Sequence, residues 1–164
     1  MLAATVCLAL LAAGCGGGSA SSPVAAEPTA TVETAATSRS EPKVRQPRGA
    51  PPRKLVVKDL IEGSGSAAKP GDELAVKYIG VRYDGSPYTN SWERSKPLRF
   101  KLGGDSLTVN PGWEKGLKGM RVGGRRELIV PPELLYQGGA IRGSKPEDAL
   151  LYVIDLVALR RAPS

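Results

Sequence analysis

The chain has 164 residues, 41% of them hydrophobic and 24% charged, which is enough for one ordinary globular domain and an additional tail. Its formal net charge is +7, and it contains no histidine, which excludes His-assisted nucleophilic catalysis and typical zinc sites. All eight aromatic residues lie beyond residue 77, so we expect the hydrophobic core in the second two-thirds of the chain.

The first residues indicate an export signal. Residues 2–13 form an apolar run that is shorter than the roughly 20 residues needed to cross a bilayer but typical of a signal-peptide core. The sequence LAAGC, ending at Cys15, resembles a bacterial lipobox, although Ala12 stands where Leu is more usual. No Lys or Arg precedes the apolar run, which suggests that the true start lies upstream of Met1.

We therefore expect a lipoprotein signal peptide over residues 1–14 and lipidation of Cys15. The protein would be exported and anchored to the outer face of the cell membrane, or to the outer membrane if the cell has one. An uncleaved short membrane anchor and an ordinary secretory signal cut nearby are the alternatives. Because Cys7 would leave with the signal and Cys15 would be acylated, cysteine chemistry is excluded from the function.

Residues 16–53 are rich in Gly, Ser, Ala, Thr and Pro and show no apolar period of 2 or 3.6. Such a segment cannot bury enough surface to fold, so we expect residues 15–53 to be the lipidated cysteine and a disordered linker, followed by a folded domain over 54–164. As a flexible chain the linker would span about 35 Å. Six basic residues lie between positions 39 and 54, and the alternative to a solvated linker is an electrostatic tether to anionic lipid or wall polymer. They are Arg39, Lys43, Arg45, Arg48, Arg53 and Lys54.

The apolar pattern changes at residue 55. Residues 55–61 predict a strand, ended by the turn-forming sequence Gly-Ser-Gly at 63–65. Residues 74–83 carry apolar side chains on both faces, which predicts a central strand covered on both sides for part of its length. After a turn at 84–87 and an irregular polar stretch, residues 98–102 alternate in the manner of a half-buried strand.

Asn110 and Pro111 predict the start of a helix, as N-cap and first helical residue. Trp113, Leu117 and Met120 follow at i, i+4 and i+7, so the helix is amphipathic and Trp113 is best placed to face a sheet. Residues 125–130 predict a strand stopped by two prolines, and residues 149–159 a strand that is apolar on both faces. Several antiparallel strands and one short helix make an α+β domain.

Four segments resemble, in order and spacing, the FKBP-type (macrolide-binding) peptidyl-prolyl cis-trans isomerase domain: VKYIG at 76–80, PLRFKLG at 97–103, PGWEKGL at 111–117 and MRVGGRR at 120–126. PPELLY at 131–136 and LLYVIDL at 150–156 extend the resemblance to about residues 54–160. It implies a curved antiparallel sheet wrapped around one short helix. It also implies an isomerase that assists the folding of exported proteins, with proline-containing polypeptides as partners and macrolides as candidate ligands. No cofactor, metal or nucleic acid is implied, and the protein is expected to be a monomer.

The resemblance further implies a proline pocket with Trp113 as its floor and Leu98 at its rim. The residues carried over as catalytic are Tyr78, Tyr88, Trp113 and Tyr136, and those carried over as substrate-binding are Thr89, Leu98, Phe100, Val109, Asn110 and Tyr152. Plain core packing is the alternative for each, above all for Phe100, because strand alternation alone places it inside. A water-poor aromatic slot lowers the rotation barrier of a prolyl amide if it binds the twisted amide better than either planar form.

Some positions depart from the family pattern. Thr89 stands where Asp is usual, and Asn110 where Ile is common. Gln137 replaces the usual Gly after the pocket tyrosine, and Ser144 replaces an apolar residue before the prolines of the flap. A non-catalytic prolyl-peptide-binding or chaperone lipoprotein with a degenerate pocket is therefore the alternative function.

Overall fold

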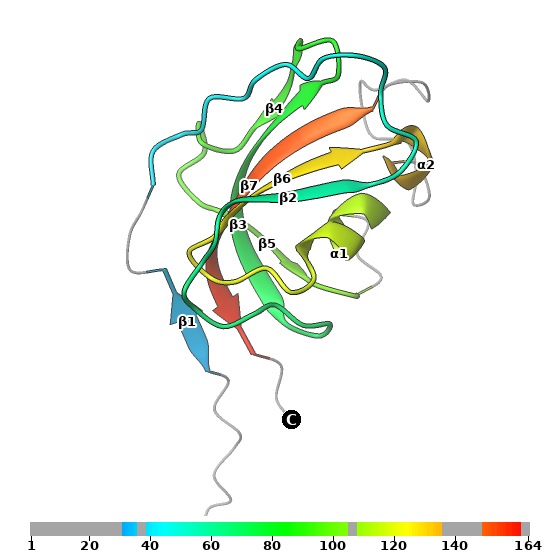
Figure 1. Cartoon of the computed structure of the whole chain (residues 1–164). Coiled ribbons are helices and arrows are strands. Elements are labelled where there is room, and N and C mark those ends of the chain that lie inside the picture. The colour runs from blue at the N-terminus through cyan, green and yellow to red at the C-terminus, as the bar shows by residue number, and fades with distance from the viewer. Residues whose placement is uncertain (1–30, 36–38, 105–107, 136–148, 162–164) are drawn as a thin grey trace, which may run out of the picture.

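The computed structural model describes residues 31–35, 39–104, 108–135 and 149–161. They form one antiparallel sheet in the order β2-β6-β7-β3-β4, with β1 paired to β7 and β5 paired to β3, and two short helices (Figure 1). The elements are β1 Val32–Thr34, β2 Val56–Ile61, β3 Glu73–Arg82, β4 Pro87–Asn90, β5 Leu98–Lys101, α1 Pro111–Leu117, β6 Arg125–Val130, α2 Pro132–Leu135 and β7 Leu150–Arg160. The expected α+β class and antiparallel sheet are confirmed.

The core lies between the sheet and α1, which the sheet curves around (Figure 1). On β7, Leu150, Tyr152, Ile154 and Leu156 belong to the same buried cluster as Trp113 and Leu117 of α1. Alternate residues of β7 are buried as well, although they point to the other face: Leu151 is 2% exposed and Val153 1%. The prediction that this strand carries apolar side chains on both faces is confirmed.

The helices differ in part from the expectation of a single one. Asn110 is the N-cap of α1 and Pro111 its first residue, as predicted, but the helix ends at Leu117 rather than running on to Met120. The two prolines after β6 do end that strand, yet Pro132 also begins α2, because a proline at the first helical position sacrifices no hydrogen bond. Within the described ranges, neither helix combines the length and the apolar character needed to cross a membrane.

The segment before the domain departs most from expectation. Ser40 and Glu41 each form a hydrogen bond with a different strand of the sheet. The Ser40 carbonyl accepts a hydrogen bond from Arg125 of β6 at 2.8 Å, and the Glu41 side chain accepts one from Asn90 of β4 at 2.8 Å. Residues 39–53 therefore cross the face of the sheet opposite α1. Further along, Ala50 accepts a hydrogen bond from the hydroxyl of Tyr83.

The three residues of β1 extend the sheet beside the end of β7, with Val32 opposite Arg160 and Thr34 opposite Ala158. The expected disordered linker is thus corrected for residues 31–35 and 39–53, which are held by hydrogen bonds rather than by an apolar stripe that the sequence would reveal. The expected signal peptide, Cys15 and the rest of the linker lie outside the described residues.

Candidate active site

A cluster of aromatic rings surrounds Trp113 of α1 on the inner face of the sheet. The Trp113 side chain is 3% exposed, and its ring centroid lies 4.9 Å from that of Tyr78 and 5.2 Å from that of Tyr152. Both pairs are edge-to-face, at 84° and 88°, an arrangement favoured by the ring quadrupoles. Phe100 of β5 adds a tilted ring at 6.0 Å. Three strands and the helix thus bring together four aromatic side chains predicted from the sequence.

Two glycines allow α1 to approach the sheet closely enough to place Trp113 there. Gly112 and Gly116 lie one turn apart and are both buried against β6. A Cβ atom at Gly116 would lie 2.6 Å from Cδ2 of Leu128, and a Cβ atom at Gly112 would clash with Val130. Because Leu128 and Val130 are themselves fully buried, neither side chain can move aside cheaply. The helix therefore packs its backbone directly on β6.

Both ends of this short helix are held by side chains. At its start, Oδ1 of Asn110 accepts a hydrogen bond from the Trp113 backbone N–H at 3.0 Å. At its end, the Arg126 guanidinium donates to the carbonyl oxygens of Gly116 and Lys118, at 2.8 and 3.3 Å, and pairs in two-pronged fashion with Asp59 of β2 at 2.6 and 2.9 Å. A cation and donors at the C-terminal carbonyls stabilise a helix. Asn110, which departs from the family pattern, thus fixes the helix that carries Trp113.

Gly80 of β3 makes room for the next wall of the cluster. A Cβ atom there would lie 2.8 Å from the Thr89 methyl carbon and 2.8 Å from Cε1 of the Tyr152 ring. Thr89 and Tyr152 therefore close over the bare backbone of β3 from opposite neighbouring strands. Two residues earlier, the backbone N–H of Tyr78 donates to the Ser91 hydroxyl at 2.7 Å, and this buried bond fixes β3 where Tyr78 emerges.

The remaining expected residues of the pocket lie at its margin or outside the described residues. Tyr88, Leu98 and Val109 are partly buried and pack against the core cluster. The Arg82 guanidinium carbon lies 5.4 Å from the centre of the Tyr88 ring, a cation–π contact at the edge of the sheet. Tyr136, Gln137 and Ser144 lie outside the described residues.

The chemistry available here is that of an apolar, water-poor surface rather than of titrating groups. The four rings of the cluster present edges and faces, and the indole Nε1 of Trp113 is buried without a hydrogen-bond partner among the described residues. Such a surface accommodates an apolar ring and removes water from the groups next to it.

The structure is an α+β domain with a buried aromatic cluster between its sheet and α1, and comparison with known proteins gives its family. The family model for "FKBP-type peptidyl-prolyl cis-trans isomerase" matches residues 64–157, more than half of the chain. The chain belongs to this family and is a peptidyl-prolyl cis-trans isomerase.

Its relatives include both shorter and longer bacterial proteins. It is 43% identical over 122 residues to the FK506-binding protein of Streptomyces anulatus, covering 73% of this chain and 97% of that one. It is 38% identical over 109 residues to the isomerase FkpA of Escherichia coli K12, covering 66% of this chain but only 39% of FkpA. The crystal structure of E. coli FkpA superposes with a TM-score of 0.59 over 66% of this chain and 49% of that one.

The S. anulatus comparison also bears on the segment before residue 54. Because 73% of the chain is about 120 residues, the aligned region must begin upstream of residue 54 wherever it ends. This agrees with the hydrogen bonds that tie residues 39–53 to the sheet. That segment is part of the folded unit rather than an appendage to it.

Sequence reasoning missed three features that position the site. Gly112 and Gly116 carry a visible signal, since two glycines one turn apart in a seven-residue helix make sense only for close packing. Gly80 signals a close approach inside a strand in the same way. Arg126 gave no such signal, because strand alternation does not tell a buried, paired arginine from a solvated one.

Proposed function

We propose that this isomerase accelerates the rotation of X–Pro bonds in exported polypeptides at the membrane surface. The observation that carries the assignment of the site is the enclosure of Trp113 by Tyr78, Phe100 and Tyr152. In this proposal the indole is the floor on which the prolyl ring rests, and Tyr152 and Phe100 are the walls. Tyr88, Leu98 and Val109 line the entrance, where their partial exposure leaves them accessible to the flanking residues of the peptide.

Catalysis follows from differential binding. The planar amide resists rotation by about 18–20 kcal/mol because the nitrogen lone pair is delocalised into the carbonyl group. The twisted amide has lost this delocalisation and is less polar, so a dry aromatic slot favours it over either planar form. No proton transfer is needed, which agrees with a cluster built from apolar rings.

Thr89 occupies the position next to Tyr88 where the family usually carries an aspartate, and its methyl group faces Gly80. A hydroxyl group cannot supply a carboxylate's charge, so orientation of the peptide falls to backbone N–H groups near Val109 and Asn110 and to the Tyr136 hydroxyl. In this proposal Asn110 has a positioning role, because its side chain is engaged with the helix backbone.

Exchange between the cis and trans forms of an X–Pro bond in a peptide, followed by NMR with and without the protein, tests this assignment. We expect Trp113→Ala and Tyr136→Phe each to lose most of the exchange acceleration while the far-ultraviolet dichroism shows a folded chain. Exchange that is as fast in both variants as in wild type would remove these residues from the site. Peptide binding without accelerated exchange in the wild-type protein would instead favour the non-catalytic prolyl-binding module.

A macrolide provides an independent probe of the same slot. The S. anulatus relative is named for binding FK506. We propose that FK506 occupies the aromatic slot of this chain too, competing with the peptide and quenching Trp113 fluorescence. Unchanged fluorescence and unchanged exchange at saturating FK506 would contradict this.

The location at the membrane depends on Cys15, which ends the lipobox-like sequence. We propose that Cys15 is lipidated after cleavage of residues 1–14 and anchors the protein on the outer side of the membrane. A Cys15→Ala variant should be released into the medium or the periplasm, and its retention in the membrane fraction would refute the lipid anchor. Because the exchange assay uses soluble protein, its outcome is independent of this one.

A further inference from the structure

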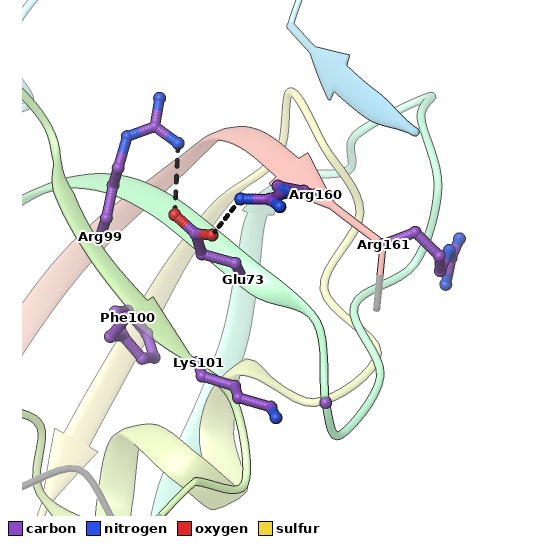
Figure 2. A pocket seen from close by; sticks show the side chains of 7 residues that line it. Glu73, Arg99, Phe100, Lys101, Arg160 and Arg161 are labelled. Atoms are coloured by element: carbon purple, nitrogen blue, oxygen red, sulfur yellow. Dashed lines mark hydrogen bonds and ion pairs between the residues drawn. The ribbon is translucent and has the colours of Figure 1, made fainter. Parts of the chain in front are cut away.

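A cleft of about 380 Å³ opens where β3 begins and β7 ends, with β5 beside them. Figure 2 shows the carboxylate of Glu73 between the side chains of Arg99 and Arg160, with Lys101 and Arg161 farther from it. We call this the basic cleft; it is lined by Gly71, Glu73, Arg99, Phe100, Lys101, Arg160 and Arg161.

Positive charge exceeds negative charge in the basic cleft. Glu73 is shared between Arg99, at 3.6 Å, and Arg160, at 3.4 Å (Figure 2). Arg161 is paired at 3.2 Å with Asp72, whose side chain is buried. Four basic side chains therefore face two carboxylates, and among the described residues no carboxylate is paired with Lys101.

The cations are also available to a ligand. The side chains of Arg99 and Arg160 are 56% and 54% exposed, and each uses only part of its guanidinium on Glu73. A guanidinium offers five donors in a planar fork that suits phosphate oxygens, and Lys101 adds an ammonium group beside it. The ligand that suits this cleft is therefore a phosphate anion.

The position of the basic cleft indicates where that phosphate comes from. The backbone N–H of Arg161 donates to the carbonyl oxygen of Thr31 at 2.9 Å, and Val32 pairs with Arg160. The chain that precedes Thr31 therefore leaves the domain beside the cleft. Fifteen residues lie between Cys15 and Thr31, and a flexible chain of that length would span on the order of 20 Å. A lipid on Cys15 would keep the cleft within reach of the membrane surface.

We propose that the basic cleft binds the phosphate headgroups of anionic lipids and thereby holds the domain on the membrane by this end. The proposal rests on the lipid anchor proposed above only for its location, since the cleft itself needs no lipidation to bind a headgroup. A single anchor of modest strength is typically reinforced by a basic surface of this kind.

This mode of docking leaves the isomerase slot open. Glu73, at the centre of the basic cleft, and Tyr78, in the aromatic cluster, both lie on β3, and their backbones are five residues or about 17 Å apart along the strand. Phe100 belongs to both regions, but its neighbours Arg99 and Lys101 alternate to the other side of β5. Removing these two charges should therefore leave catalysis intact.

The test is cosedimentation of the chain from residue 16 onward, which keeps every described residue, with vesicles of phosphatidylglycerol and phosphatidylcholine. The variant carries Arg99→Gln and Lys101→Gln, which leave Glu73 its Arg160 partner. The matched control carries Arg45→Gln and Arg48→Gln, an equal loss of charge at exposed residues of the 39–53 segment. Peptide exchange measured on all three proteins checks that the fold and the slot are unchanged.

We expect the cleft variant to lose about 30-fold in affinity for anionic vesicles, roughly fivefold for each charge, and the control to lose less than about threefold. None of the three proteins should bind vesicles of phosphatidylcholine alone. Equal losses in variant and control would overturn the proposal in favour of the basic 39–53 segment, and so would wild-type protein that fails to bind anionic vesicles. Because exchange is measured separately, neither result bears on the isomerase assignment.

Discussion

The contact between α1 and β6 gives the sharpest prediction, because two effects of opposite sign act at Gly116. Replacing a helical glycine by alanine ordinarily stabilises a protein by up to about 1 kcal/mol. Here the added methyl group would lie 2.6 and 2.8 Å from the two terminal carbons of Leu128, against an ordinary carbon–carbon contact of about 3.5–4.0 Å. Leu128 is 0% exposed and cannot swing aside, so α1 must move outward by about 1 Å.

Overpacking of this kind costs about 1–3 kcal/mol, which outweighs the gain in helix propensity. We therefore expect Gly116→Ala to lower the free energy of unfolding in urea by about 1–2 kcal/mol. Trp113 lies one turn earlier on the same helix, so its ring would shift against Tyr78 and Tyr152. We expect kcat/KM for a prolyl peptide to fall at least about tenfold, since displacements of 1 Å at a catalytic surface carry penalties of this size.

Gly119→Ala is the matched control. A Cβ atom there would meet nothing within 4 Å, but the backbone φ of +77° lies in the left-handed region, so the substitution should cost about 1 kcal/mol of stability without moving α1. Its kcat/KM should equal that of wild type. Adding Leu128→Val to Gly116→Ala should recover part of the lost activity by making room. A Gly116→Ala protein that is as stable and as active as wild type would refute the close-packing argument.

Three further predictions concern the groups that hold the fold in place. Arg126→Lys should destabilise the protein by about 1–3 kcal/mol in urea, because an ammonium group cannot serve Asp59 and the carbonyl oxygen of Gly116 together; unchanged stability would contradict the helix-capping role. A chain that begins at residue 54 should unfold about 2–3 kcal/mol more easily than one that begins at residue 31, since it loses the bonds to Arg125 and Asn90 and the pairing of β1; equal melting curves would show that residues 31–53 contribute nothing. Hydrogen bonds from Ser66 lower the pKa of Glu33. The ionised carboxylate therefore stabilises the folded chain above the pKa of about 4.3 that Glu33 has in the unfolded chain, and this stabilisation is lost as the pH falls through the lowered pKa. The protection factor of the Ala35 amide, which is the intrinsic exchange rate divided by the observed rate, should fall there, and in a Glu33→Gln variant it should not depend on pH in this range.

Most of the fold could be predicted from apolar spacing. The predicted boundaries of β2, β3, β5, β6 and β7 differ from the structure by at most one residue at each end. In β3, β5, β6 and β7 side chains are buried with a period of two or on both faces, whereas β2 is exposed along its length and was indicated by its apolar residues and the turn after it. β4 escaped prediction, since its four residues PYTN show no clear alternation and are defined by their pairing with β3. β1 has only three residues, and its place depends on backbone bonds to β7, which lie more than 120 residues away in sequence.

The candidate site could be predicted in its residue types but not in its support. Trp113 faces the sheet because of its place on the amphipathic helix, and Phe100 faces inward because of strand alternation. Tyr78, Tyr88 and Tyr152 were indicated by family resemblance, and the structure brings Tyr78 and Tyr152 against Trp113 while Tyr88 lies at the edge. The roles of Gly116 and Arg126 depend on which element lies opposite, information that local sequence does not contain.

The pairing of β1 with β7 imposes an order on folding during synthesis. Residues 32–34 have no partner strand until residues 158–160 have been made, although they are among the earliest described residues to leave the ribosome. The central strand β7 follows every other described strand in the sequence, and both β6 and β3 pair with it, so strand edges stay open until its residues have been made. We expect nascent chains arrested before residue 150 to depend on a holding chaperone, and the sheet to form once residues 150–160 are free to pair.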